Sequence, residues 1–166
     1  MKEKSIKIII IEIVLTIVAV GQIILSFVLY DKNGNMIIRN AGWMLLWVSA
    51  LFGWLPIFVF KKYGNVPKGK GYVHTRQLVD RGVYAIVRHP QYVAGILMAI
   101  ALFLIAQQWI IGILGAILIV IYYLSAFDEE KATLEKLGEP YQNYMNNVPR
   151  FNFMAGLFKR IRRSLT

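Results

Sequence analysis

The sequence predicts an all-α, polytopic membrane protein with about four transmembrane helices. Apolar residues make up 57% of the 166 residues, more than a soluble domain of this length usually carries. They form long blocks rather than stripes, which is typical of helices that cross a bilayer. Basic residues flank these blocks, where anionic headgroups would lie. The net charge of +10 therefore indicates a membrane surface, and not nucleic acid, as the partner.

The first two apolar blocks are each long enough to cross the membrane. Residues 8–30 follow three lysines and would span about 30 Å as a helix, so we interpret them as a retained anchor rather than a signal peptide. A polar turn at residues 31–35 leads to the second block, residues 41–60, in which Pro56 predicts a kink. Residues 61–73, with several glycines and lysines, predict an irregular interfacial loop.

The third and fourth blocks predict a short helical hairpin. Residues 91–106 and 109–127 are separated only by Gln107 and Gln108, and both blocks are at the short end for a membrane span. Gly112 in the second of them, and Gly115 one turn later, would let a neighbouring backbone approach closely.

The chain becomes polar after residue 127. We expect a new helix to begin at Asp128, run to about residue 137 and stop at Gly138, with Pro140 just beyond it. Residues 152–166 form a basic tail.

The distribution of charge predicts the orientation. Four crossings place the N-terminus, the 61–88 segment and everything after residue 127 on one side of the membrane. All lysines and arginines except Lys32 and Arg39 belong to that side. Because basic loops stay in the cytoplasm, we expect both termini to be cytoplasmic.

Two polar patches lie at the cytoplasmic end of the predicted hairpin, and polar groups at a membrane edge suggest function. They are Arg88-His89-Pro90-Gln91-Tyr92 and Asp128-Glu129-Glu130. Taken singly, the first could be an interfacial belt of arginine and aromatic residues, and the second could complement a helix dipole. With two histidines and no cysteine, the chain does not predict a metal site.

Taken together, the patches predict a binding pocket. Pro90 suits the first turn of a helix, whose free N–H groups, with Arg88, would favour an anionic group. Tyr84 and Tyr92 offer flat walls for an adenine ring. Three adjacent carboxylates favour an ammonium group or ribose hydroxyls. A pocket with these parts suits a zwitterionic nucleoside such as S-adenosylmethionine.

The spacing of these residues resembles a known family. Leu78-Val79-x-x-Gly82-x-Tyr84-x-x-x-Arg88-His89-Pro90-x-Tyr92-x-x-Gly95 is similar to the signature of the isoprenylcysteine carboxyl methyltransferase family, which includes phospholipid methyltransferases. Glu129-Glu130, followed at family spacing by Gly138, Tyr141, Tyr144 and Val148-Pro149-Arg150, resembles its C-terminal half. The resemblance covers residues 78–151 and leaves residues 1–77 and 152–166 as flanking parts of a single domain, 1–166.

The resemblance implies an integral-membrane methyltransferase that uses S-adenosylmethionine. A C-terminal helical segment would close over the cofactor on the cytosolic side, and a lipid or small hydrophobic acceptor would enter from the bilayer. No catalytic residue or oligomeric state is assigned. The cofactor-binding residues implied are Leu78, Val79, Tyr84, Arg88, His89, Pro90, Tyr92, Glu129 and Glu130.

The acceptor stays open at this point. The resemblance favours methylation of an isoprenylcysteine-type carboxylate, but Ser125 stands where those enzymes place an arginine, and only Arg76 offers a substitute. Methylation of a phospholipid amine or of a thiol is the alternative. Further alternatives are an NADPH-dependent sterol-type reductase, which would share the Arg-His-x-x-Tyr segment, and a non-catalytic membrane protein.

Overall fold

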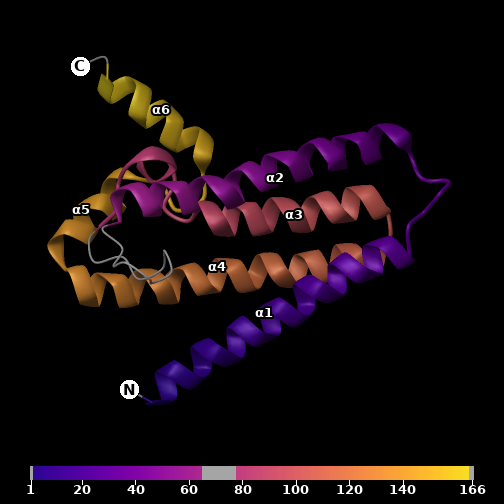
Figure 1. Cartoon of the computed structure of the whole chain (residues 1–166), viewed down its shortest axis with the longest axis horizontal. Coiled ribbons are helices and arrows are strands. Elements are labelled where there is room, and N and C mark those ends of the chain that lie inside the picture. The colour runs from indigo at the N-terminus through magenta and orange to yellow at the C-terminus, as the bar shows by residue number, and fades with distance from the viewer. Residues whose placement is uncertain (1, 65–77, 165–166) are drawn as a thin grey trace. The chain divides into compact units, whose positions relative to one another are not determined.

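In the computed structural model, which describes residues 2–64 and 78–164, every regular element is helical. Figure 1 shows the elements in chain order. They are α1 (Lys2–Val28), α2 (Met36–Tyr63), the 3-10 helix η1 (Gly82–Ala85), α3 (Pro90–Ala106), α4 (Trp109–Leu137), α5 (Glu139–Asn147) and α6 (Phe153–Ser164). Helices α1, α2 and α4 are long and apolar enough to cross a membrane, and α3 is a shorter apolar helix. The prediction of an all-α, polytopic membrane protein is confirmed.

The described residues form two compact units. The first contains residues up to 49 and residues 95–124, so it holds α1, the start of α2 and most of the α3–α4 hairpin. The second contains residues 50–94 and those from 125 onward, and therefore both polar patches.

In the first unit, one buried glutamine joins three helices. The Nε2 of Gln22 in α1 donates to the carbonyl oxygens of Ala99 in α3 at 3.0 Å and Ile111 in α4 at 3.1 Å. Gly115 makes this approach possible, because a methyl group there would come within 2.9 Å of Gln22 Nε2 and 3.2 Å of the Ala99 oxygen. The close packing expected at Gly115 is therefore present.

The two turns of the first unit lie at the same end. The Asp31 N–H donates to the carbonyl oxygen of Ala106 at 3.2 Å. The Gln107 side chain accepts from the Asn35 N–H and donates to the Asn35 oxygen, both at 2.8 Å. Gln107 ends the hairpin's first helix with a positive φ of 54°. In a chain whose successive helices cross the membrane in alternating directions, the first and third turns must lie at the same end, as these two do.

Large apolar side chains cover the outside of the first unit. Ile17 is 65% exposed and Trp47 74% exposed, which is the reverse of a soluble protein's surface. Lipid chains are the environment that such a surface fits.

The second unit departs from the predicted boundaries. We expected a helix to begin at Asp128, but α4 runs without a break from Trp109 to Leu137. The acidic patch therefore lies inside a helix and cannot complement an N-terminal dipole. The helix ends as expected at Gly138, which has a φ of +62°. Of the loop expected at 61–73, the first residues extend α2 to Tyr63, and 65–73 lie outside the described residues, as does Arg76.

Candidate functional site

The first polar patch follows a sharp turn of the chain. Gly82 opens η1 with a φ of +61° and lies so close to Val59 of α2 that a methyl group there would come within 2.8 Å of it. After η1 the backbone pairs with a segment far along the sequence. The Arg88 N–H donates to the Pro149 oxygen at 3.0 Å, and the His89 N–H donates to the Arg150 oxygen at 3.3 Å. This pairing brings the start of α3 to the segment that follows α5.

Glu130 is the centre of a buried charged cluster. Its side chain is 3% exposed, and Oε1 accepts from Arg150 Nε at 2.9 Å and lies 3.0 Å from both His89 Nε2 and Arg88 Nη1. Its Oε2 accepts from Arg150 Nη2 at 2.5 Å. Three basic side chains from two segments thus converge on one carboxylate, and buried charges of opposite sign in hydrogen-bond contact stabilise one another.

His89 lies between the two adjacent glutamates. Its Nδ1 is 3.6 Å from Glu129 Oε2, and its ring stacks on Tyr92 with centroids 5.3 Å apart and planes within 6°. Burial lowers the pKa of the His89 imidazole, but hydrogen bonds to Glu129 and Glu130 and their charges outweigh burial. The pKa of His89 is therefore raised above 6.5, which favours the protonated ring.

Arg88 keeps one buried donor without a partner. Its side chain is only 9% exposed, and its Nη1 is ion-paired with Glu130, but within the described part of the chain its Nε has no hydrogen-bond partner. A buried guanidinium donor without a partner costs free energy. It can hold an anionic group of a ligand.

The aromatic residues of α5 support the turn that leads to this cluster. The Tyr144 hydroxyl donates to the carbonyl oxygen of Tyr84 at 2.7 Å, and the Tyr84 ring packs on Phe60 of α2 at 4.7 Å. Burial raises the pKa of Tyr144, and it raises the pKa of Tyr141 to about 12. Both hydroxyls therefore stay protonated at neutral pH, so Tyr144 remains a donor.

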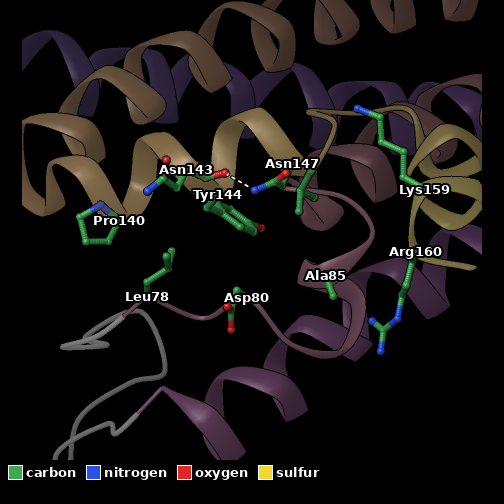
Figure 2. Close-up of a pocket in the computed structure, with 11 residues that line it drawn as sticks. Leu78, Asp80, Ala85, Pro140, Asn143, Tyr144, Asn147, Lys159 and Arg160 are labelled. Carbon is green, nitrogen blue, oxygen red and sulfur yellow. Dashed lines mark hydrogen bonds between the residues drawn. The ribbon is translucent and has the colours of Figure 1, made fainter. Parts of the chain in front are cut away.

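A cavity of about 350 Å³ lies beside α5 and α6. Figure 2 shows Asn143 and Tyr144 of α5 on one side, and Lys159 and Arg160 of α6 on another. Its lining combines apolar groups with amides and charges of both signs. The lining residues are Leu78, Asp80, Ala85, Pro140, Asn143, Tyr144, Asn147, Val148, Gly156, Lys159 and Arg160.

Five of the nine residues that the sequence predicted for the cofactor site lie together in the structure. Arg88, His89, Tyr92, Glu129 and Glu130 form one cluster with direct contacts.

The remaining four predicted residues lie elsewhere. Leu78 lines the cavity and packs against Tyr141 and Tyr144. Val79, Tyr84 and Pro90 are buried.

Arg150 is the residue that the sequence did not assign. It makes two hydrogen bonds to Glu130, and its guanidinium lies 3.7 Å from the centre of the Phe127 ring. Its place in the Val148-Pro149-Arg150 segment was the available signal, but spacing alone does not show which carboxylate an arginine reaches.

The comparisons with known proteins bear on this site. A family model described as phospholipid methyltransferase matches residues 37–139, which is more than half of the chain and includes both polar patches. No curated protein matches the chain.

Proposed function

The chain belongs to the phospholipid methyltransferase family, and from this premise we propose that it transfers a methyl group from S-adenosylmethionine to an acceptor in the membrane. The observation that carries the proposal is the cluster around His89, in which Arg88 keeps a buried Nε donor without a partner and the exposed carboxylate of Glu129 lies 3.6 Å from the His89 ring. Family membership favours methyl transfer over the reductase and over a non-catalytic protein.

The residues of the cluster fit the charged parts of this cofactor. Arg88 offers its buried Nε donor to a carboxylate. Glu129, whose side chain is 54% exposed, offers a carboxylate to an ammonium group or to ribose hydroxyls. Glu130 is saturated by three basic side chains, so its role would be to hold those side chains rather than to bind the ligand.

The cavity supports the same proposal by its size. Its volume of about 350 Å³ falls within the range of ligand pockets, and Leu78 and Tyr144 give it apolar surface for a base. Leu78 is also one of the residues implied by the family signature.

The chemistry asks the protein for alignment rather than for covalent catalysis. S-adenosylmethionine supplies an activated methyl group when it is bound. Arg88 and Glu129 would orient the ligand, and Glu130 would fix the positions of Arg88 and His89 through its ion pairs. The raised pKa of His89 favours the protonated form of the ring, which cannot act as a general base.

The acceptor that the observations support best is a lipid. Ser125 stands in α4 where the prenylcysteine enzymes place an arginine, and the family match is to phospholipid methyltransferases. Arg150, the basic side chain over nearby Phe127, is already paired with Glu130. We therefore favour a phospholipid headgroup amine over a prenylcysteine carboxylate, the acceptor that the sequence resemblance alone favoured. The headgroup ammonium would first give up a proton to water, after which its nitrogen would take the methyl group and the sulfonium would leave as a neutral thioether.

A labelling experiment tests this function. Purified protein in lipid nanodiscs would be incubated with S-adenosylmethionine labelled in its methyl group, and the lipid products identified by mass spectrometry. We expect label in a phospholipid headgroup, and much less of it with Glu129→Gln at a cofactor concentration that does not saturate the variant. Label in a carboxyl ester would correct the acceptor, and no labelled product from folded protein would contradict the proposal.

A further inference from the structure

Helix α6 carries an exposed apolar stripe. Met154, Phe158 and Ile161 recur at helical spacing, and they are 58%, 67% and 48% exposed. They lie on one face of the helix, because residues four and seven positions apart are neighbours on its surface. Among the described residues of the second unit, all three side chains stay exposed.

The opposite side of α6 is packed against the second unit. A methyl group at Gly156 would overlap the carbonyl oxygen of Ile86, so the two backbones are in close contact. Gly156 lies about half a turn from Met154 and Phe158. The apolar stripe therefore lies on the side of α6 that faces away from Ile86.

Two contacts relate α6 to the part of α2 that exposes apolar side chains. At the start of α6, Phe153 packs edge-on against Phe52 of α2, with ring centroids 5.0 Å apart. About two turns later, Arg160 Nη1 donates to the Gly82 oxygen at 3.2 Å, and Gly82 lies against Val59, about two turns after Phe52.

Over this part of α2 the exposed side chains are large and apolar. Trp54 is 67% exposed and Phe58 is 59% exposed, and both belong to a candidate membrane span. Lipid chains are the natural cover for them. Because α6 begins beside Phe52, the start of the helix lies near a surface whose exposed side chains suit lipid.

The charge of α6 identifies the kind of lipid. Arg162 is exposed beside the apolar stripe, Lys159 is exposed between the stripe and the cavity that it also lines, and the helix contains no acidic residue. An amphipathic helix with basic residues along its apolar face lies in the headgroup region and gains affinity from anionic lipids.

We propose that α6 is an interfacial helix that inserts Met154, Phe158 and Ile161 into the bilayer and binds anionic phospholipid headgroups through Lys159 and Arg162. The contacts of α6 with Ile86 and Gly82 connect this lipid contact to the turn that leads into Arg88 and His89. Anionic lipid would thereby stabilise the turn from which the charged cluster is built.

Single-cysteine labelling of the full chain tests this inference, since the chain has no cysteine of its own. An environment-sensitive fluorophore would be attached at Phe158→Cys, and at the exposed Gln142→Cys of α5 for comparison. The protein would be placed in nanodiscs of phosphatidylcholine with increasing phosphatidylglycerol. We expect the probe at 158 to shift toward blue emission and to be quenched by a lipid-borne quencher, more so with phosphatidylglycerol. The probe at 142 should not respond.

Charge-reversed variants then separate lipid charge from general burial. Lys159→Glu with Arg162→Glu should lose the response to phosphatidylglycerol, since each basic residue near an anionic surface strengthens binding by a factor of about five. Lys131→Glu with Lys136→Glu in α4 changes the net charge equally and should keep the response. A water-like probe at 158 in every bilayer would overturn the proposal. A blue shift of the probe at 158 that is lost when the protein is diluted in detergent would also overturn it, because a second copy of the chain would then cover the stripe. None of these readouts depends on methyl transfer.

Discussion

Glu129 and Glu130 are neighbours in the sequence with opposite surroundings. Glu130 is buried among Arg88, His89 and Arg150, and Glu129 is half exposed. One step along a helix turns a side chain by about 100°, so only the packing of α4 decides which glutamate faces the protein. The sequence predicted that the region around these residues would be a site, but it could not divide the roles within the pair.

This division predicts different effects on stability. Glu130→Gln removes the negative charge that three buried or half-buried basic groups share, and we expect the free energy of unfolding to fall by about 3 kcal/mol. Denaturant unfolding in detergent, followed by circular dichroism, would measure it.

Glu129→Gln is the matched control, with the same chemical change one residue away. Its side chain is 54% exposed and contacts only the His89 end of the cluster, so its effect on unfolding should stay within about 1 kcal/mol. Equal losses for the two variants would show that Glu130 does not hold the cluster together.

The raised pKa of His89 predicts a dependence of stability on pH. A group whose pKa is higher in the folded protein stabilises it fully below the unfolded pKa of 6.5, and this contribution is lost as the pH rises through the folded pKa. We expect the melting temperature to fall as the pH rises through the folded pKa of His89. The fall should be smaller in His89→Asn, and identical dependence of the melting temperature on pH in both proteins would contradict the assignment.

At the scale of the elements, the apolar blocks predicted the spans closely because hydrocarbon thickness fixes their length. The sequence also predicted the hairpin, from two apolar blocks with a two-residue gap, and the end of α4, from Gly138. The boundary expected at Asp128 was wrong, since a change from apolar to polar side chains does not interrupt backbone hydrogen bonds. The residues after Asp128 are mostly good helix formers, so α4 continues. The basic tail was predicted, but not that it folds as α6.

Two glycines in the first unit predict opposite effects of the same substitution. Gly115→Ala would force a methyl group against Gln22 and the Ala99 backbone, and we expect a loss of about 1–3 kcal/mol in stability. Gly21→Ala has nothing within 4 Å, so it should leave stability unchanged or raise it by up to about 1 kcal/mol. Thermal unfolding of both variants in one detergent makes the comparison. Comparable losses would mean that the hairpin does not pack on α1 as described.

At the scale of the whole molecule, the distribution of lysine and arginine predicts the orientation in the membrane. The turns at residues 31–35 and 107–108 are joined by hydrogen bonds, so a single probe reports on both. Which end faces the cytoplasm remains a prediction from charge alone, because a fold in isolation carries no membrane sidedness.

Cysteine accessibility in intact cells would test the orientation. Asn33→Cys lies in the first turn, and Gln142→Cys lies in α5. We expect an impermeant maleimide to label position 33 from outside and to label position 142 only after the cells are opened. The reverse pattern would place both termini outside the cytoplasm and contradict the prediction.

Calorimetric titration of the purified protein with S-adenosylmethionine tests the central claim most directly, namely that the charged cluster holds this cofactor. We expect saturable binding to the native protein. Because hydrogen bonds to charged groups contribute about 1.5–3 kcal/mol, His89→Ala and Glu129→Gln should bind about ten-fold to a hundred-fold more weakly. Lys136→Gln, on the exposed end of α4, should bind as the native protein does. Unchanged affinity in the His89 and Glu129 variants, or no binding by folded native protein, would contradict the account.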